Sequence, residues 1–470
     1  MPEVHRAAGN APFPPEWPPN VRSLASAIEG SERGPGGRPS GRWRAAILLS
    51  LLAGISFIDK FIMSILAQPI SQDLALSDGQ IGLLIGPAFA ILFALSGLPA
   101  AFLIDTRNRK KLVLAGVSVW SLMTIASGFC HQFALLAMMR SGVAIGEAVL
   151  APAAFSMIAD LFNEEERALP VTIFMIVTAA MGVGSMAIGG LAMMIATRLS
   201  PLLSAAPWRL TLMMVGIPGL FIACCFHLLV VEPRRREQPS AHAIDMRAFF
   251  RELSGKKEIY VSLLGSSAAF AFFCYSMLSW APTILARAHA YSPARAGIAL
   301  GMIMTPVTII SIYAWPRLAR LIEKRRPALG FALCMQAASL LAVVPFVIAP
   351  VLASTDLFLA GLVGPALLTG AWGTLTPLAS QSIAPGWMVA RVTAINLLLT
   401  NLLGYGAGPV LTVTLGDLWK RSGVPQWSGI VSEPIAWGIA SEGAIAVVVM
   451  LITTTLFAHA MRTHAAVGKR

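Results

Sequence analysis

The sequence has little charge for its length. Only 12% of its 470 residues are Asp, Glu, Lys or Arg, whereas 56% are hydrophobic and the mean hydropathy is +0.72. A typical soluble domain contains about 25% charged residues, so this composition excludes an ordinary soluble enzyme or binding domain. We therefore expect an all-α protein that crosses a membrane many times.

Cysteine and histidine are also scarce. The seven histidines form no cluster, and the five cysteines lie in or at the ends of apolar stretches without any CxxC pair. This spacing argues against a disulfide framework and a zinc site, so no metal and no cofactor are expected. No nucleophile–base pair lies on a shared helix face, so we expect no enzymatic activity.

The first forty residues lack the apolar core of a signal peptide. They are rich in Pro, Gly and Arg, and this composition predicts a disordered cytoplasmic tail over residues 1–42.

Twelve stretches after this tail are apolar enough to cross a bilayer, which takes about 20 residues in a helix. We expect them to form an N-terminal six-helix bundle (43–231), a cytoplasmic linker (232–258), a C-terminal six-helix bundle (259–462) and a short cytoplasmic tail (463–470). The spans are expected to start near Ala45, Gln80, Lys111, Phe133, Ala168, Trp208, Ile259, Arg295, Pro327, Thr355, Val389 and Pro434.

The net charge of +12 is concentrated in alternate loops, which argues against nucleic-acid binding. The loops after the second, sixth and eighth spans are rich in Lys and Arg, whereas the first loop has none. This positive-inside bias predicts that both termini are cytoplasmic. The basic residues are Arg107, Arg109, Lys110, Lys111, Arg234, Arg235, Arg236, Lys256, Lys257, Arg317, Arg320, Lys324, Arg325 and Arg326.

The two sets of six spans share features at corresponding positions. Each has a basic loop after its second span and a fifth span dense in glycine. Paired features of this kind are typical of transporters in which two related halves rock around a central site. Glycines that merely let helices pack closely are the alternative explanation.

Three charged residues interrupt the apolar spans of the first half. Asp59 lies about 21 Å into the first span, and Arg140 lies about 10 Å into the fourth, which runs in the opposite direction. The two are thus expected at nearly the same depth, where pairing would lower the cost of burying them. Glu147 follows Arg140 by two helical turns on the same face, close to the midplane.

A carboxyl group at that depth needs a proton, water or a cation to stabilise it. We therefore expect Asp59, Arg140 and Glu147 to couple transport to protons, with a static network that orders the bundle as the alternative. Lys60 points about 100° away from Asp59 and is either a second partner or snorkels toward the interface.

The loop after the second span suggests a cytoplasmic lock between the halves. A carboxylate among basic residues can latch one half to the other, or the basic residues can simply anchor the loop. The candidate lock residues are Asp105, Arg109 and Lys110 at this loop, together with Asp160 and Arg167 in the loop after the fourth span.

The second half has few charges within its spans, Glu442 in the twelfth being one of them. Its polar and aromatic residues are the candidates for binding substrate together with Arg140 and Glu147, although each is individually as compatible with helix packing. These candidates are Tyr275, Trp280, Thr376, Asn396 and Asn401.

Several motifs resemble those of the major facilitator superfamily and, within it, the spinster-like lipid transporters. The segment Asp105-Thr-Arg-Asn-Arg-Lys-Lys111 resembles the superfamily signature after the second span. The segment from Arg140 to Ala148 (RSGVAIGEA) resembles the spinster motif R-G-L-x-G-x-G-E-A, and Phe57-Ile-Asp-Lys60 resembles its Y-M-D-R. The second basic loop departs from the signature because it lacks the acid.

The resemblance implies twelve transmembrane helices in two bundles, alternating access, and export of lysophospholipids or sphingoid phosphates. It also implies coupling roles for Asp59, Arg140 and Glu147. The expected partners are an amphipathic, anionic lipid-like substrate, protons and membrane lipids, and we expect a monomer in a bacterial inner membrane. A porter of small organic anions is the alternative, and a membrane sensor without transport is an alternative of another class.

Overall fold

The computed structural model describes residues 39–235, 246–326 and 329–467, and within them the fold is all-helical apart from one isolated β-bridge between Leu352 and Ile430. The helices are α2 (Pro39–Leu74), α3 (Asp78–Ile85), α4 (Pro87–Thr106), α5 (Arg109–Ser127), α6 (Phe133–Glu147), α7 (Leu150–Leu161), α8 (Ala168–Leu203), α9 (Pro207–Leu229), α10 (Met246–Gly255), α11 (Lys257–Ala288), α12 (Pro293–Arg325), α13 (Gly330–Leu341), the π-helix η1 (Val344–Ile348), the 3₁₀-helix η2 (Ala349–Val351), α14 (Thr355–Gly361), α15 (Val363–Gly373), α16 (Leu375–Ile383), α17 (Gly386–Leu399), the π-helix η3 (Thr400–Ala407), α18 (Gly408–Ser422) and α19 (Pro434–Val467).

Twelve helical segments of the described chain are long and apolar enough to cross a membrane, as predicted. Seven of them are single helices, and the others are interrupted: α3 with α4, α6 with α7, α13 with η1 and η2, α14 with α15 and α16, and α17 with η3 and α18. The predicted fold class is therefore confirmed.

Short polar side chains cap the helices that follow tight loops. The Ser77 hydroxyl accepts a hydrogen bond from the Gln80 backbone N–H, and the Asn108 amide oxygen accepts one from the Lys111 N–H at 2.8 Å. Such caps satisfy donors that a helix start leaves unpaired, at about 1 kcal/mol each. They set where α3 and α5 begin.

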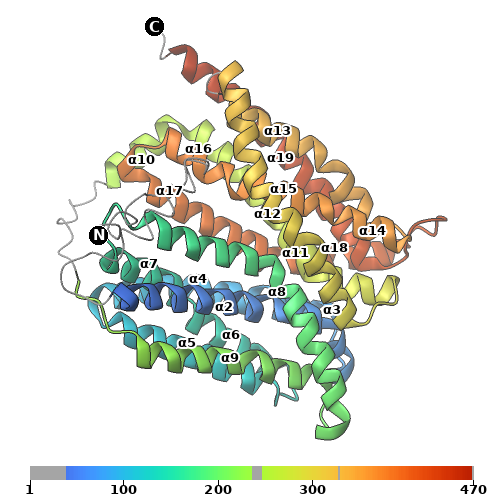
Figure 1. Ribbon diagram of the computed structural model, residues 1–470. Coiled ribbons are helices and arrows are strands. Elements are labelled where there is room, and N and C mark those ends of the chain that lie inside the picture. The colour runs from blue at the N-terminus through green and yellow to red at the C-terminus, as the bar shows by residue number, and fades with distance from the viewer. Residues whose placement is uncertain (1–38, 236–245, 327–328, 468–470) are drawn as a thin grey trace, which may run out of the picture.

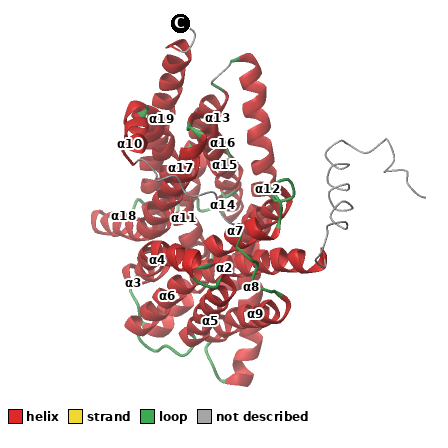
Figure 2. Cartoon of the chain, turned by 90° about the vertical axis from the view of Figure 1, so that its left-hand side faces the viewer, coloured by secondary structure: helices red, strands yellow, loops and turns green. Residues whose placement is uncertain are grey.

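The spans fall into two groups in space. The first group runs from α2 to α9 and the second from α11 to α19; Figure 1 shows them as separate blue-to-green and yellow-to-red sets, and Figure 2 shows one set above the other. The predicted linker contains the short helix α10, and its residues 236–245 lie outside the described chain, as does most of the predicted tail 1–42.

The molecule has two ends along the helix axes. We call the end where α5 begins and α12 finishes the Arg109 end, and the end where α3 begins and α11 finishes the Arg287 end. In Figure 1 the groups come together on the right, at the Arg287 end, and their axes diverge toward the left. The positive-inside bias predicts that the Arg109 end faces the cytoplasm.

The groups are joined by close packing of α8 against α12. A Cβ atom built on Gly190 would lie 2.7 Å from the backbone oxygen of Ala294, and one on Gly301 would collide with Ala187. Only glycine allows the two helices to approach so closely. The glycine-dense fifth span thus has the packing role that was one of its two predicted explanations.

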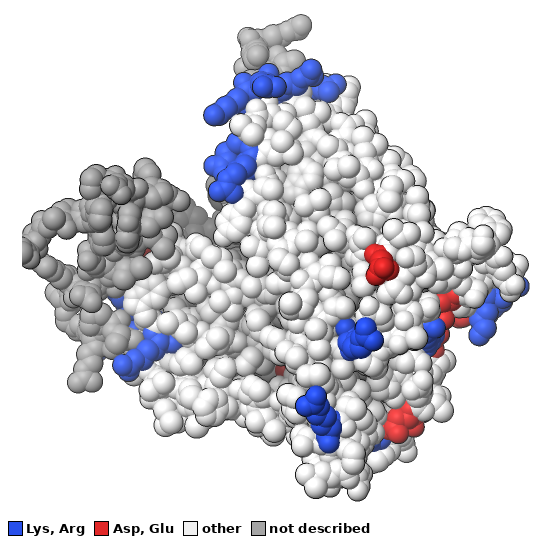
Figure 3. Space-filling view, turned by 45° about the vertical axis from the view of Figure 1, so that its right-hand side comes forward, with Lys and Arg blue, Asp and Glu red and all other residues white. Residues whose placement is uncertain are grey.

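The outer surface suits a lipid environment. On α4, Leu98 is 83% exposed and Phe102 is 68% exposed. The face drawn in Figure 3 is mostly uncharged. Such a surface is stable only where hydrocarbon surrounds it, which supports a membrane location for these helices.

Candidate functional site

The three predicted coupling residues lie buried inside the first group. Asp59 of α2 is 0% exposed, Arg140 of α6 is 1% exposed, and Glu147, the last residue of α6, is 5% exposed. Residues 148 and 149 interrupt the helix before α7 begins. The structure therefore brings Asp59, Arg140 and Glu147 together as the sequence predicted.

Arg140 lies beside Asp59 as predicted, but its hydrogen bond goes to the backbone of Asp59 rather than to the carboxylate. The Arg140 guanidinium donates from Nη1 to the backbone oxygen of Asp59 at 3.1 Å, and it lies 5.4 Å from the centre of the Phe89 ring. Both carboxylate oxygens of Asp59 are buried without a hydrogen-bond partner, and Thr124 of α5 is close beside them. The guanidinium thus faces the backbone and an aromatic ring, while the carboxyl faces α5.

Several polar atoms at this position lack a hydrogen bond of ordinary geometry, although the Tyr405 hydroxyl lies close to the Arg140 guanidinium. They include Nε and Nη2 of Arg140 and Oε1 of Glu147, in addition to the Asp59 carboxylate. Leaving such groups buried and unpaired costs several kcal/mol each. The arrangement is suited to bind something that supplies the missing interactions, such as a proton on a carboxyl or an anion at the guanidinium.

Lys60 neither pairs with Asp59 nor snorkels. It is 8% exposed, and its ammonium group donates to the side-chain oxygen of Asn401 at 3.2 Å. Four aromatic rings surround the same ammonium group, with centres 4.6 to 5.8 Å from Nζ. We call these rings the aromatic cage; they are Phe89, Phe93, Tyr275 and Tyr405.

The aromatic cage joins the two groups of helices. Phe89 and Phe93 belong to α4 of the first group, whereas Tyr275 belongs to α11 and Tyr405 to η3 of the second. The Tyr405 hydroxyl also donates to the backbone oxygen of Lys60 at 2.8 Å. A cation enclosed by aromatic faces is stabilised by about 2 kcal/mol when water is excluded.

Two irregular stretches of backbone, η3 and the break between α3 and α4, allow the two groups to meet at the aromatic cage. A π-helix, which adds one residue to a turn and re-aims its side chains, places Tyr405 and Asn401 toward the first group. Opposite it, α3 ends and α4 begins at Gly86, where a Cβ atom would lie 2.7 Å from the backbone oxygen of Gly406. Pro87 at the start of α4 explains the break, because proline cannot donate to the preceding turn.

The predicted substrate residues of the second group divide into three sets. Tyr275 and Asn401 lie at the cage. Trp280 is fully buried and donates to the backbone oxygen of Pro409 at 2.9 Å, which is a packing contact between α11 and α18. Thr376 of α16 and Asn396 of α17 have buried side-chain oxygens without partners, and no recorded contact joins either one to the cage.

The predicted lock residues form contacts within the first group and the residues that follow it. Arg109 is 1% exposed and binds Asp160, Glu232 and the backbone oxygen of Pro233. Its partners among the described residues do not include any residue of the second group. These contacts fix the Arg109 end of the first group rather than latching the two groups together.

The other lock candidates also contact the first group or the residues that follow it. Lys110 donates from its ammonium group to the His227 backbone oxygen at 2.8 Å, and Arg167 donates to the Ala159 backbone oxygen at 2.8 Å. Asp105 is exposed, and its backbone oxygen, rather than its carboxylate, accepts from Arg235.

A second charged cluster, which the sequence reasoning missed, joins the groups at the Arg287 end. Arg287 of α11 contacts Asp78 of α3 at 2.6 and 2.9 Å, Gln68 of α2 at 2.8 Å and Glu433 at 3.4 Å. We call Gln68, Asp78, Arg287 and Glu433 the Arg287 cluster. The bidentate contact gives this Arg–Asp pair a defined geometry.

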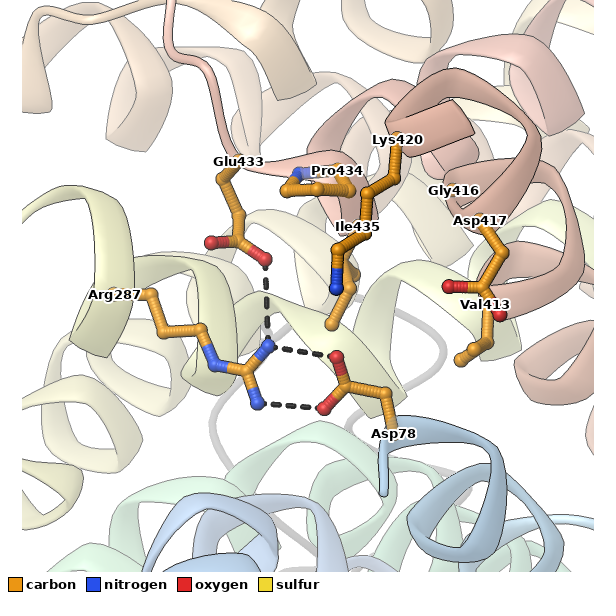
Figure 4. Close-up of a pocket in the computed structure, with 9 residues that line it drawn as sticks. All are labelled: Asp78, Arg287, Val413, Gly416, Asp417, Lys420, Glu433, Pro434 and Ile435. Atoms are coloured by element: carbon orange, nitrogen blue, oxygen red, sulfur yellow. Dashed lines mark hydrogen bonds and ion pairs between the residues drawn. The ribbon is translucent and has the colours of Figure 1, made fainter. Parts of the chain in front are cut away.

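The Arg287 cluster borders a pocket of about 250 Å³, shown in Figure 4. Asp417 and Lys420 of α18 also line it. The cluster and the cage are the two places where described residues of the two groups form hydrogen bonds or ion pairs with one another.

The family model of the Major Facilitator Superfamily matches residues 49–409. The chain belongs to the major facilitator superfamily. Membership agrees with the twelve spans and the two groups of helices, and it places the chain among membrane transporters.

The chain is also similar to individual transporters of known type. The chain is 28% identical to an MFS-type efflux pump of Mycolicibacterium smegmatis over 62% of this chain and 65% of the pump. It is 27% identical to a probable L-galactonate transporter of Escherichia coli over 52% of this chain and 54% of that protein. The chain thus spans about two thirds of the one relative's length and half of the other's.

The structural similarity extends further along the chain. A bacterial homolog of the human lysosomal transporter Spinster, in an inward-facing and unoccupied conformation, superimposes with a TM-score of 0.77 at 26% identity, covering 91% of this chain and 98% of that one. The predicted resemblance to spinster-like transporters is therefore confirmed.

Proposed function

We propose that the chain is a proton-coupled secondary transporter that moves an amphipathic, anionic lipid-like substrate of the lysophospholipid or sphingoid phosphate class. The observation that supports it most is the joint burial of two cations, Lys60 and Arg140, beside the acids Asp59 and Glu147. The proposal also places the protein, as a monomer, in a bacterial inner membrane.

The cations are suited to an anionic head group. Two N–H-bearing nitrogens of Arg140, Nε and Nη2, lack a hydrogen bond of ordinary geometry, and a guanidinium can bind a phosphate through two parallel hydrogen bonds. Lys60 lies at the same contact between the groups and adds a second positive charge. A head group bound there would contact both groups of helices at once.

The neighbouring surface is suited to an acyl chain. Leu397 precedes Asn401 by one turn and is 56% exposed. Phe57 precedes Phe61 by one turn, stacks on it with ring centres 6.5 Å apart, and is partly exposed. Both residues lie on the Arg109 side of the cage, so apolar surface adjoins the cationic site in that direction.

The acids are suited to carry the proton. Protonation of Glu147 or Asp59 changes the charge beside Arg140 and Lys60 by one unit inside a low-dielectric region, where charge interactions are strong. A proton arriving at either acid would weaken its hold on the cations and change their affinity for an anion. Coupling by this route requires no further ionisable group.

The contacts between the groups are suited to alternating access. The Arg287 cluster closes one end, whereas at the other end Arg109 binds Asp160 and Glu232 and no described residue of the second group. Opening would break the Arg287–Asp78 pair, and closing would bring the Arg109 ends of the two groups together.

The test measures internal pH in proteoliposomes that contain a pH-sensitive dye. One arm receives a lysophospholipid or sphingoid phosphate, and the other receives a sugar phosphate. Glu147→Gln is compared with the matched surface variant Glu165→Gln and with bare liposomes, because lysolipids disturb membranes. We expect a lipid-dependent proton flux that Glu147→Gln abolishes and Glu165→Gln keeps; the absence of flux in the lipid arm would contradict the proposal.

Transport of small organic anions is the second candidate. The similarity to a probable L-galactonate transporter favours it, as do the hydrogen-bonding groups that converge on Lys60 from Asn401 and Tyr405. Flux in the sugar phosphate arm alone would keep the transporter and replace the substrate class.

A further inference from the structure

Glu442 of α19 is a buried carboxyl that the proposed mechanism does not use. It is 0% exposed and lies within the second group, away from Asp59, Arg140 and Glu147. Its oxygen Oε1 accepts from the hydroxyl of Ser276 on α11 at 2.5 Å, and Oε2 accepts from the hydroxyl of Thr412 on α18. One carboxyl thus connects three helices.

No charged side chain of the neighbouring elements offsets Glu442. The elements packed on α19 are α11, α13, α18, η1 and η2. None of their described ionisable groups interacts with Glu442, whose recorded partners are the two hydroxyls. The ionisable groups nearest along those helices are Cys274 and Tyr275 on α11, Cys334 on α13 and Asp417 on α18, and η1 and η2 contain none.

Each hydroxyl has a second acceptor within reach. Ser276 Oγ lies 2.9 Å from the backbone oxygen of Phe272, and Thr412 Oγ1 lies 3.2 Å from that of Gly408. A hydroxyl group can donate one hydrogen bond while accepting others. Both hydroxyls can donate to an ionised Glu442, or one can turn to its own helix carbonyl and accept the proton of a neutral Glu442.

Both protonation states therefore leave every polar atom of this site satisfied. A buried carboxyl with fixed partners leaves a polar atom unsatisfied when its protonation changes, which is unfavourable. Glu442 differs, because the proton it gains or loses is matched by rotation of a hydroxyl. A residue with this property can exchange a proton without unfolding its surroundings.

The Glu442 site lies next to the segments of the second group that carry the aromatic cage. Ser276 directly follows Tyr275 of the aromatic cage, and Gly408 directly follows η3, which carries Asn401 and Tyr405. Gly408 has no side chain, and a Cβ there would collide with the Ser276 hydroxyl. A change in the bonds of Glu442 would thus act on α11, which carries Tyr275, and on α18, which continues η3.

The pocket at the Arg287 cluster is lined by residues of the two helices that carry Thr412 and Glu442. Val413, the neighbour of Thr412, lines this pocket, as does Ile435, which lies two turns before Glu442 on α19 (Figure 4). Two turns correspond to about 10 Å along the helix. Glu442 is therefore separated by about that distance, along α19, from a residue that lines the pocket.

We propose that Glu442 is a second proton-binding residue, which takes up and releases a proton at the Arg287 end and positions α11 and α18 behind the aromatic cage. It rests on the proposed function only in assuming that protons drive the cycle. The proton binding itself is measured without transport.

The experiment follows the C=O stretching band of protonated carboxyl groups by infrared spectroscopy, on the full chain in lipid vesicles, from acid to alkaline pH. We expect a titrating band that is absent in Glu442→Gln and present in Glu147→Gln and Asp59→Asn. Glutamine can donate and accept at this position, so Glu442→Gln is expected to fold.

Two hydroxyl variants add a sharper readout. Thr412→Val removes a donor to the ionised form, so the midpoint of the Glu442 band is expected to move to higher pH by about one unit. Thr454 lies on α19, as Glu442 does, and its buried hydroxyl contacts Met450 and Ser339. Thr454→Val removes that hydroxyl and is expected to leave the band unchanged.

Two results would overturn the inference: no band from Glu442 at any pH, or a band that stays constant over the whole range. The first would mean a permanently ionised residue and the second a permanently neutral structural one. A titrating Glu442 band in a protein that shows no proton flux with any substrate would refute the proposed function and leave this inference standing.

Discussion

At the scale of single residues, the ammonium group of Lys60 is surrounded by side chains that lie far away in the sequence. Its ammonium group is enclosed by Asn401 and the aromatic cage, which come from both groups of helices. The sequence singles out Asp59, Arg140 and Glu147 because charges stand out in apolar spans. Of the cage rings, only Tyr275 is a candidate from the sequence; Phe89 and Phe93 do not stand out among 22 phenylalanines, and tertiary contacts are needed to assign any of the rings to Lys60.

The same limit applies to the hydrogen bonds between Arg140 and Asp59. Depth along two helices predicted correctly that Asp59 and Arg140 meet. It could not predict that the guanidinium binds the backbone oxygen and the face of Phe89, because that choice depends on side-chain rotamers.

Removing the charge of Lys60 should weaken substrate binding. We expect Lys60→Met to raise the Kd for an anionic lysophospholipid by about ten- to a hundredfold, since a charge-assisted hydrogen bond is worth about 1.5–3 kcal/mol. Equilibrium binding to the purified protein provides the measurement. Lys324→Met, at an exposed position, serves as the control, and an equal Kd in the two variants would remove Lys60 from the site.

The stability of the Arg287 end should fall in acid. His289 follows α11, its ring lies against Phe358, and burial lowers its pKa below the usual value of 6.5. Protons therefore bind the unfolded chain more readily, so the contribution of neutral His289 is complete above about pH 6.5 and is lost as pH falls toward the folded pKa. Thermal unfolding followed against pH should show a smaller acid loss in His289→Gln; identical pH profiles would refute this assignment.

At the scale of elements, hydropathy predicted all twelve spans and their starts to within a few residues. The interruptions could not be predicted in the same way. The break at Gly86, the end of α6 at Glu147 and the π-helix η3 depend on what each backbone packs against in the folded protein. These irregular turns line the candidate site, where irregular backbone within a membrane protein is tolerated.

The packing of α8 on α12 gives a test at this scale. Gly190→Ala places a Cβ against the backbone of α12, so we expect it to lower stability by about 1–3 kcal/mol and to reduce the apparent unfolding temperature. Gly97→Ala is the matched control, because a Cβ there has nothing within 4 Å and alanine favours the helix. Equal unfolding temperatures for the two variants would contradict the close contact.

At the scale of the whole molecule, repeated features in the two halves predicted two groups of spans. The cytoplasmic lock was sought at the basic loop, whereas the charged contact between the groups lies at the Arg287 end. Arg287 and Asp78 sit near span ends, where the sequence offers no reason to prefer them over other charged residues. Their pairing depends on how the groups are placed relative to each other.

Breaking this contact should open the Arg287 end. We expect Asp78→Asn with Arg287→Gln to raise the open population about tenfold, which corresponds to about 1.4 kcal/mol. Distances between spin labels at positions 202 and 427, both exposed, would report it in a background without native cysteines. The charge swap Asp78→Arg with Arg287→Asp should restore the closed distances, and unchanged distances in the neutral variant would exclude a closing role.

The central claim is that the buried acids couple protons to movement of the substrate. It is tested most directly by measuring two kinds of transport of a labelled lysophospholipid in the same Glu147→Gln vesicles: accumulation driven by a pH gradient and exchange without a gradient. The account predicts that gradient-driven accumulation is lost while exchange continues, because the carrier still folds and still changes conformation. Accumulation that still follows the pH gradient in this variant would contradict it.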